Sequence, residues 1–320
     1  MNAAVVHAFT TPPRYESFAD PIPAPGEKLV TVTAAGLHPI VKALAAGTHY
    51  GSGTTLPFIA GVDGVGRLDD GTRVYFGVSR SPFGTMAERA LAGNAMCLPL
   101  PDALDDATAA ATANPAMSSW VALTARAKFT AGESVLILGA TGVAGQLAIQ
   151  IAKRLGARRV VATGRNPQAL EEAKSLGADQ TISLDQDHDA LVSALRQEVA
   201  SNGVDVVLDY LWGPPAQAAL EAIAQKGLTK AAPRVRYIQI GSMAGATIPL
   251  PAATLRSSGL ELLGSGFGSA SLDQIAQSLT AYFSAAAANP FQTSIQTAPL
   301  RDVERLWNTP ERATRLVFQP

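Results

Sequence analysis

The chain has 320 residues, of which 47% are hydrophobic and 16% are charged, and its formal net charge is -1. This composition is typical of a soluble globular protein with one large or two medium domains, and the charge argues against a general nucleic-acid-binding surface. The single cysteine, Cys97, excludes an intrachain disulfide and a cysteine-based zinc cluster.

Two segments bear on where the protein works. Residues 1–9 have no basic stretch before an apolar core, so we expect no secretory signal there. The uncharged window 134–152 approaches the length of a membrane span, but it contains three glycines and two glutamines. We therefore expect a cytoplasmic protein.

The first part of the chain, up to about Ala113, alternates short apolar segments with glycine and proline. The clearest strand candidates are residues 4–9, 29–34, 73–78 and 87–92. Short strands separated by turn residues predict a compact, mostly antiparallel β domain. Residues 105–113 are rich in alanine and predicted to be helical, and residues 118–128 are predicted to form a connecting helix.

A strand, a glycine-containing turn and a helix are predicted for residues 134–156. Residues 135–138 indicate a buried strand, and apolar residues then recur at helical spacing. The turn G-A-T-G-V-A-G fits the dinucleotide-binding pattern G-x-G-x-x-G if Ala140 replaces the first glycine at a negative φ. Gly142 would let the backbone approach a diphosphate at the helix N-terminus, and Gly145 would let helix and strand pack closely. The alternative is a tight turn without a ligand.

The next strand, residues 159–163, indicates which dinucleotide is bound. An NAD site usually ends this strand with an acidic residue, whereas an NADP site supplies a cation for the 2′-phosphate. Here the strand leads into Gly164, Arg165 and Asn166, and no acid is present. We interpret Arg165 as a phosphate ligand and predict NADPH as the cofactor. The alternative is a solvated arginine beside Asn166, which is predicted to cap a helix that starts at Pro167.

Strands and helices alternate over the rest of this region. Strands are predicted at residues 180–184, 204–208, 235–240 and 259–263, and helices at 167–176, 190–199 and 215–225. This alternation predicts a doubly wound parallel sheet of the α/β class. Because ligands collect at the carboxyl ends of such strands, residues there are cofactor candidates, although ordinary loop packing is an equal alternative for each. They are Tyr210, Leu211, Trp212, Gly241, Ser242, Gly266 and Phe267.

From end to end the chain resembles the zinc-independent quinone oxidoreductase branch of the medium-chain dehydrogenase/reductase superfamily. The resemblance rests on the turn G-A-T-G-V-A-G and on the segments 23–32, 36–39, 61–66, 83–88 and 132–145. It implies a GroES-like, β-rich catalytic domain (1–115, completed by 288–320) and an inserted Rossmann NADPH-binding domain (116–287). It also implies hydride transfer from NADPH and a homodimer joined through residues 259–263.

The same resemblance allows a test for zinc. Zinc-dependent members place metal ligands at the positions that align with His38, Val62 and Asn114. Val62 has no donor atom and Asn114 is a poor zinc ligand. We therefore expect no metal and no simple alcohol oxidation, which would need a Lewis acid.

The predicted reaction is reduction of a quinone or an activated α,β-unsaturated carbonyl compound, which needs little beyond orientation. Three residues that depart from the branch's pattern are the catalytic candidates. His49 or Tyr50 is predicted to orient the substrate or protonate an enolate, and His38 stands where the branch usually has asparagine. A solvent-facing loop histidine is the alternative for His49. Asn114 and Met117 are predicted to line the substrate pocket, and a core position is the alternative for Met117.

The complete set of predicted NADPH ligands combines the connecting helix, the turn and the strand ends: Ser118, Ala140, Thr141, Gly142, Val143, Gly145, Gly164, Arg165, Asn166, Tyr210, Leu211, Gly241, Ser242, Gly266 and Phe267. Two other functions remain open. One is an enoyl-thioester reductase on the same fold, and the other is an NADPH-binding sensor or structural protein with little turnover.

Overall fold

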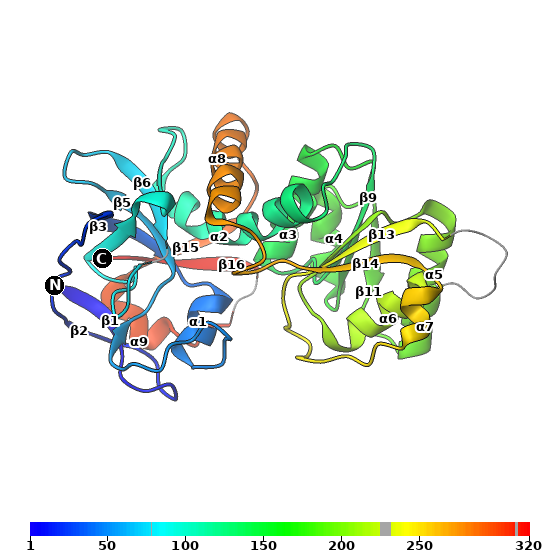
Figure 1. Ribbon diagram of the computed structural model, residues 1–320, viewed down its shortest axis with the longest axis horizontal. Coiled ribbons are helices and arrows are strands. Elements are labelled where there is room, and N and C mark those ends of the chain that lie inside the picture. Colours follow the sequence, from blue (N-terminus) through cyan, green and yellow to red (C-terminus); the bar gives the residue numbers. More distant parts are fainter. Residues whose placement is uncertain (78, 225–231, 311–312) are drawn as a thin grey trace. The chain divides into compact units, whose positions relative to one another are not determined.

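The computed structural model describes residues 1–77, 79–224, 232–310 and 313–320. These residues form two compact units (Figure 1). The first comprises Met1–Pro115 and Ile275–Pro320, and the second comprises Ala116–Gln274.

The first unit is built on antiparallel sheets. A three-stranded sheet has the order β2 (Arg14–Ser17), β1 (Asn2–Val6), β4 (Phe58–Ile59). A seven-stranded sheet has the order β15-β16-β3-β5-β6-β8, and β7 also pairs with β3. Its strands are β3 (Glu27–Gly36), β5 (Asp63–Arg67), β6 (Arg73–Gly77), β7 (Arg89–Gly93), β8 (Cys97–Pro99), β15 (Ser294–Pro299) and β16 (Thr314–Gln319). The mostly antiparallel β domain predicted for the first part of the chain is thus confirmed.

The end of the chain contributes strands and helices to the first unit. β16 pairs antiparallel with β3, with Val317 opposite Gly36, and β15 runs parallel to β16. Helices α1 (Pro39–Ala45), α8 (Leu272–Ala288) and α9 (Val303–Leu306) accompany the sheets. Helix α2 (Asp106–Val121) begins in this unit and continues past Pro115 into the residues predicted to form the connecting helix.

The boundary between the units differs from the expected one. The sequence places it at residue 288, whereas the first unit already resumes at Ile275 and includes most of α8. Aromatic packing explains the difference, because the Phe283 ring meets the Tyr75 ring edge-on at 5.4 Å between centroids. The Tyr282 and Phe283 side chains of α8 are both buried, at 1% and 2% exposed. These contacts attach α8 to the first unit.

The second unit is a six-stranded parallel sheet in the order β11-β10-β9-β12-β13-β14. The strands are β9 (Ser134–Leu138), β10 (Arg159–Gly164), β11 (Gln180–Ser183), β12 (Val206–Asp209), β13 (Arg234–Gln239) and β14 (Gly259–Gly264). When the six strands are numbered in chain order within the unit, their order across the sheet is 3-2-1-4-5-6, which is the Rossmann order. The predicted doubly wound parallel sheet is confirmed, and the switch point lies between β9 and β12.

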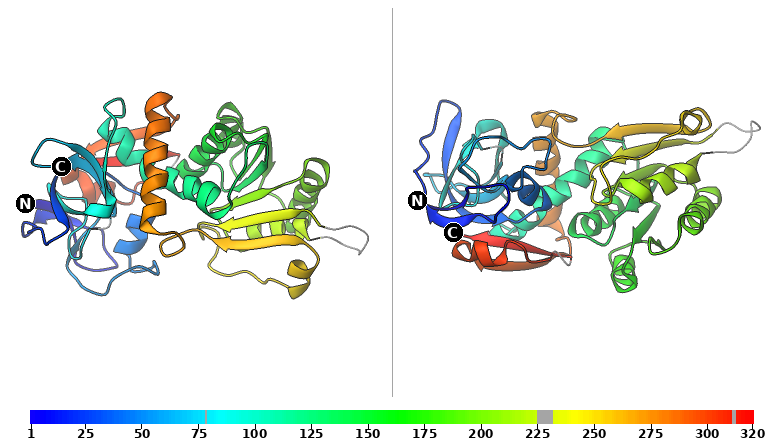
Figure 2. Two further views of the ribbon diagram at one scale, coloured as in Figure 1. Left: turned by 45° about the horizontal axis from the view of Figure 1, so that its top comes forward. Right: turned by 90° about the horizontal axis from the view of Figure 1, so that it is seen from below.

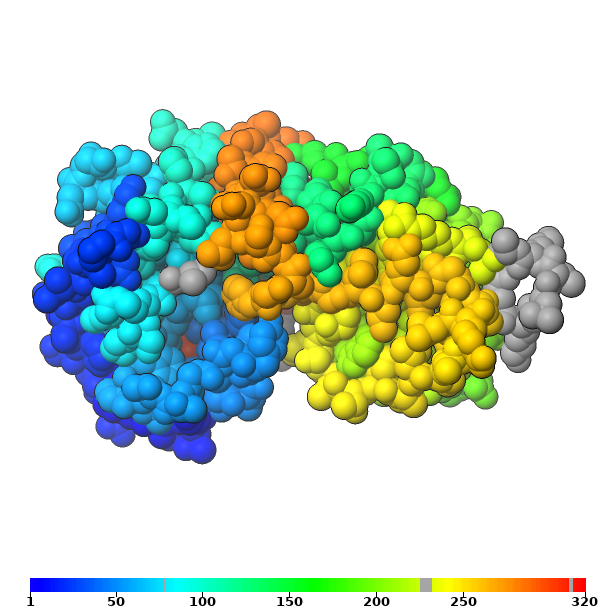
Figure 3. Space-filling view, viewed as in Figure 1, coloured from blue at the N-terminus to red at the C-terminus, as the bar shows by residue number. Residues whose placement is uncertain are grey.

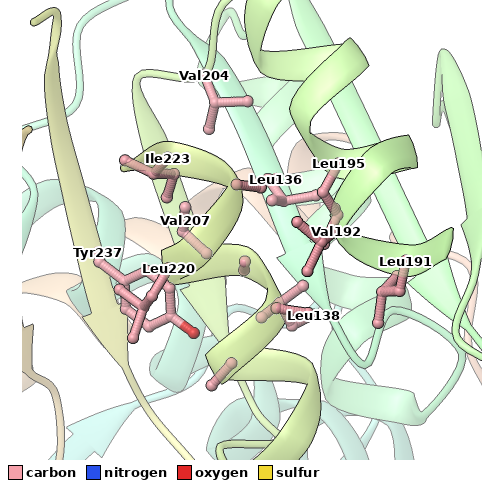
Figure 4. Packing of buried hydrophobic residues seen from close by; sticks show 14 of the residues in the cluster. Leu136, Leu138, Leu191, Val192, Leu195, Val204, Val207, Leu220, Ile223 and Tyr237 are labelled. Carbon is pink, nitrogen blue, oxygen red and sulfur yellow. The ribbon is translucent and has the colours of Figure 1, made fainter. Parts of the chain in front are cut away.

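Helices lie on both faces of this sheet (Figure 2). They are α3 (Val143–Arg154), α4 (Pro167–Ser175), α5 (His188–Asn202), α6 (Gly213–Ile223) and the short α7 (Ala252–Arg256). All five residues of β9 are buried, as its apolar sequence predicts. On one face, Leu136, Val207 and Leu220 belong to a core cluster shared by β9, β12, α5 and α6 (Figure 4). This cluster holds the carboxyl ends of β9 and β12 side by side.

The strand β14 forms the open edge of the sheet. Glu261 and Leu262 are exposed on it, and the segment that contains β14 lies at the surface of the second unit (Figure 3). Among the residues that the structure describes, none of the helices has both the length and the apolar character that crossing a membrane requires.

Candidate cofactor site

The turn between β9 and α3 has the backbone of a dinucleotide-binding turn. Gly139 has a φ of +88°, which favours glycine. Ala140 is outside the left-handed region, so an alanine can replace the first glycine of the pattern without backbone strain. The Ala140 N–H donates to the Thr163 carbonyl at 2.8 Å, which ties the turn to β10. The helix begins at Val143, and no side chain of the described residues caps it at Gly142. Its first N–H groups are therefore available to an anion.

Gly142 and Gly145 are needed for different reasons. A Cβ on Gly145 would overlap the Gly139 carbonyl oxygen and lie 2.5 Å from the Ala140 Cα, so only glycine lets the helix approach the strand. A Cβ on Gly142 would meet no heavy atom within 4 Å. The fold therefore leaves open space beside Gly142, which is where a diphosphate approaches the backbone of this motif.

The arginine after β10 is available for a ligand. Arg165 is exposed, and within the described part of the chain it makes no hydrogen bond or ion pair. Two other arginines nearby are already bound, Arg158 to Asp205 and Arg159 to Glu198. As predicted, Asn166 caps α4, because its Oδ1 accepts from the N–H groups of Gln168 and Ala169 at 2.9 and 3.2 Å.

A close approach also explains the small residue at the end of β10. A Cβ on Gly164 would overlap Cγ2 of Thr141, so the side chain of Thr141 packs on the strand end next to Arg165. The residues predicted from these two loops, Thr141, Gly142, Val143, Gly164 and Arg165, are thus neighbours in the structure.

The loop after β12 adds a second wall. Leu211 lies 3.0 Å from the position of a Cβ on Gly139, and a Cβ on Gly241 would lie 2.7 Å from the Tyr210 carbonyl oxygen. The Tyr210 hydroxyl lies 3.3 Å from the Ser118 Oγ, and burial raises the pKa of Tyr210 to about 12. Four predicted cofactor residues, Ser118, Tyr210, Leu211 and Gly241, therefore gather beside the glycine turn.

The residues after β13 and β14 are less closely grouped. Ser242 is exposed next to Gly241. Gly266 and Phe267 follow the edge strand β14, which is two strands away from β12, and Phe267 is 46% exposed. The Gly266 N–H donates to Ser269 Oγ at 2.7 Å, so that loop is closed on itself.

Sequence reasoning missed a buried carboxylate at the end of β12. Asp209 is 0% exposed, and its Oδ2 accepts from the Tyr237 hydroxyl at 2.7 Å. Its Oδ1 accepts from the N–H groups of Leu211 and Trp212 at 2.8 and 2.9 Å. Burial raises the pKa of Asp209, and the three donors act in the opposite direction. The sequence feature that could have revealed this carboxylate is the acidic residue at the end of an otherwise apolar strand.

His38 does not fit the catalytic role predicted for it. It is 1% exposed in the first unit, and its Nε2 lies 3.6 Å from the Asp63 Oδ1. Asp63 accepts from the Tyr75 hydroxyl at 2.9 Å, and buried Arg315 donates to the Leu37 carbonyl at 2.7 Å. Burial lowers the pKa of His38 and lowers that of Arg315 to about 10. A substrate has no access to this imidazole, so we assign His38 to the core of the first unit.

The lowered pKa of His38 predicts a pH-dependent stability. The unfolded chain protonates His38 near its ordinary value of 6.5, whereas burial opposes protonation in the folded state. The contribution to stability is therefore complete above that value and is lost as the pH falls. Between about pH 7.5 and about pH 5.5, we expect the wild-type Tm to fall about 2 °C or more further than that of His38→Asn. Parallel decreases in a calorimetric series would contradict this reading.

The other two catalytic candidates lie in the loop after α1. His49 and Tyr50 have ring centroids 4.1 Å apart with an interplanar angle of 32°, and Tyr50 is 74% exposed. The His49 Nδ1 accepts from the Gly51 N–H at 3.0 Å, which leaves the proton of a neutral ring on Nε2. Partial burial lowers the pKa of His49.

The predicted substrate residues lie on α2, Asn114 next to Pro115 and Met117 half-buried one turn further on. Among the described residues, no group of three or more His, Cys, Asp or Glu side chains is arranged to hold a metal ion.

Known proteins resemble this chain over its whole length. A protein-family model described as zinc-binding dehydrogenase matches residues 143–282. A probable NADPH-dependent quinone reductase of Emericella nidulans is 26% identical, with both chains covered completely. The quinone oxidoreductase of Thermus thermophilus, whose structure is also known in complex with NADPH, has a TM-score of 0.80 at 26% identity, again with complete coverage of both chains. The resemblance of the chain to the quinone oxidoreductase branch of the medium-chain dehydrogenase/reductase superfamily is thus confirmed.

Another relative is an enzyme of a different kind. A mycocerosic acid synthase-like polyketide synthase of Mycobacterium tuberculosis is 31% identical over 228 residues, which are 68% of this chain and 10% of that protein. The matching region is therefore a small part of a much longer enzyme.

Proposed function

We propose that this chain is an NADPH-dependent oxidoreductase that transfers a hydride to a quinone or to an activated α,β-unsaturated carbonyl compound, without a catalytic metal. The observation that carries the proposal is the unpaired cation of Arg165 at the end of β10, beside a glycine turn with an uncapped helix N-terminus. A quinone reductase and a quinone oxidoreductase among its relatives support the same reaction class.

The second unit holds the cofactor. The open space beside Gly142 and the free N–H groups of α3 suit a diphosphate, and the guanidinium of Arg165 suits a 2′-phosphate. Tyr210, Leu211 and Gly241 form the neighbouring wall. When bound, NADPH supplies the hydride, and the protein's own contribution is to bind and orient it.

The first unit is assigned to the acceptor. A quinone is already electrophilic, and its reduced oxygens take protons from water, so positioning alone supplies much of the rate. An enone needs a proton at carbon as well, and His49 is the candidate donor through Nε2–H.

The test is an acceptor screen with purified protein and NADPH. We expect rapid NADPH oxidation with 9,10-phenanthrenequinone or with simple enones. Tight binding of NADPH without oxidation by any acceptor would instead indicate a sensor or structural protein.

A second candidate, an enoyl-thioester reductase, is favoured by the polyketide synthase relative. Turnover of an acyl thioester such as crotonyl-N-acetylcysteamine, with slow quinone reduction, would establish it in place of the first.

His49→Ala is expected to slow enone reduction at least about tenfold and quinone reduction much less, because only the enone requires a positioned proton. The acid form of His49 is the imidazolium, and burial lowers the pKa of His49, so this form accumulates only below the usual range for histidine. The wild-type enone-to-quinone rate ratio should therefore rise as the pH falls. Tyr50→Phe, which keeps the ring contact and removes the hydroxyl, tests the other candidate donor in the same assay. Unchanged enone turnover in His49→Ala would exclude the proton-donor role.

Activity is expected to survive dialysis against a strong chelator within about twofold, because a catalytic zinc needs three protein ligands and Val62 and Asn114 do not supply them. Steady-state rates before and after dialysis measure this. A loss of activity that added zinc restores would show that the metal-free mechanism is wrong.

We also propose a homodimer in which the open edge of β14 pairs with the same strand of a second copy. The exposure of Leu262 on this edge supports the pairing, since an exposed apolar edge strand favours association. A cytoplasmic location completes the proposal, and the single cysteine suits a reducing compartment.

A further inference from the structure

The loop that follows β12 is held by one carboxylate. Asp209 receives two backbone N–H groups on Oδ1 and the Tyr237 hydroxyl on Oδ2, and its own carbonyl accepts from the N–H groups of Ile240 and Gly241. The side chain therefore fixes the turn after its own strand, and the main chain fixes the start of the loop after β13.

The conformation that Asp209 holds is one that the chain does not favour. Trp212 has a φ of +54° and a ψ of −157°, which is an outlier for a bulky residue. Such a conformation persists only where the surroundings determine it, and the Trp212 N–H is one of the two that Asp209 binds. The Trp212 ring also meets the Tyr237 ring edge-on at 6.4 Å.

The shape of this turn is passed on to its neighbours. The Leu211 side chain packs against Gly139 of the glycine turn, and the Leu211 carbonyl accepts from the Ala244 N–H at 2.7 Å. A Cβ on Gly213 would lie 2.5 Å from the Ala244 carbonyl oxygen. If residues 210–213 relaxed, Leu211 would leave Gly139, and the loops after β9 and β13 would lose a shared support.

We propose that Asp209 and Tyr237 are a positioning pair for the cofactor site. They hold residues 210–213 in a strained turn, so that the wall formed by Tyr210 and Leu211 is in place before NADPH arrives. The pair touches the cofactor only through this turn. The inference rests on the proposed function, since it concerns the same site.

The experiment compares Asp209→Ala and Asp209→Asn with Asp205→Ala as a matched control. Asp205 precedes the same strand at its opposite end, where its Oδ2 accepts from the Ser134 N–H and Oγ at 2.8 and 2.9 Å. NADPH affinity is measured by fluorescence titration without an acceptor. The turn itself is measured in cofactor-free protein by hydrogen exchange at the Leu211 and Trp212 amides and by near-ultraviolet circular dichroism of the Trp212 region.

We expect Asp209→Ala to raise the Kd for NADPH at least about tenfold and to speed exchange at both amides, because their buried acceptor is gone. Asp209→Asn keeps one oxygen for these N–H groups and should recover most of the affinity. Tyr237→Phe should have an intermediate effect, and it tests the pair if Asp209→Ala fails to fold. Asp205→Ala should change the Kd by less than about twofold while lowering the Tm, because it removes the acceptor of the Ser134 hydrogen bonds away from the turn.

Two outcomes would overturn the inference. One is an unchanged Kd in Asp209→Ala or Tyr237→Phe, and the other is an equal loss of affinity in Asp205→Ala, which would reflect general destabilisation. The titration of the wild type separates this from the proposed function. If the wild type binds no NADPH, the proposed function is wrong, whereas hydrogen exchange still reports whether Asp209 holds the turn.

Discussion

Replacing Arg165 with aspartate is expected to weaken NADPH binding about 100-fold while NADH binding changes less than about threefold. The wild-type guanidinium is exposed and unpaired within the described residues, so a 2′-phosphate would gain its full charge-assisted contact. Aspartate removes this contact, repels the phosphate and offers an acceptor to the ribose hydroxyl of NADH. Steady-state KM values and fluorescence titrations with both cofactors measure the preference.

The control for this experiment is Arg256→Asp. Arg256 is an exposed arginine in the last turn of α7, in the same unit but outside the site, and its replacement changes the net charge by the same amount. It should leave both cofactors nearly unaffected. Equal losses for NADPH and NADH in Arg165→Asp, or an equal loss for NADPH in Arg256→Asp, would remove Arg165 from the site.

Gly142→Ala and Gly145→Ala are expected to separate cofactor binding from folding. An alanine at position 142 meets no neighbouring atom and has an ordinary backbone conformation, with a φ of −85°. We expect an unchanged Tm and an NADPH affinity at least about tenfold lower, because the added methyl group fills the space proposed for the diphosphate. At position 145 the methyl group overlaps backbone, so the free energy of unfolding should fall by about 2 kcal/mol.

Thermal denaturation and NADPH titration of the two variants provide the comparison. The proposal for the turn fails if Gly142→Ala binds NADPH like the wild type. A decrease in Tm for Gly142→Ala as large as that for Gly145→Ala would show that the open space beside Gly142 is not open in solution.

The parts of the fold that local sequence determines were predicted correctly. The strand β9 is a short apolar run bounded by a glycine turn, and Asn166 and Pro167 carry their capping chemistry with them. The role of Gly145 also follows from its spacing, since the helix of this motif must pass close to the strand. In each of these cases the deciding interactions lie within a few residues.

The predictions that failed depend on contacts between distant segments. His38 looks like a loop histidine beside a proline, but Asp63 and Arg315 enclose it from elsewhere in the chain. Asp209 ends an apolar strand, and its partner Tyr237 lies 28 residues away, so its role depends on a distant contact. The boundary at α8 was misplaced because the rings that attach this helix to Tyr75 have no local signal.

The pairing of β16 with β3 has a consequence for how the protein is made. The second unit is continuous in sequence, so all of its residues are synthesised before those of β15 and β16. The first unit must wait, because Val317 pairs with Gly36 and Arg315 lies in its core. The first unit therefore remains incomplete until β16 is made, whereas the second unit can fold earlier. This order is the reverse of the usual one, in which the amino-terminal domain folds first.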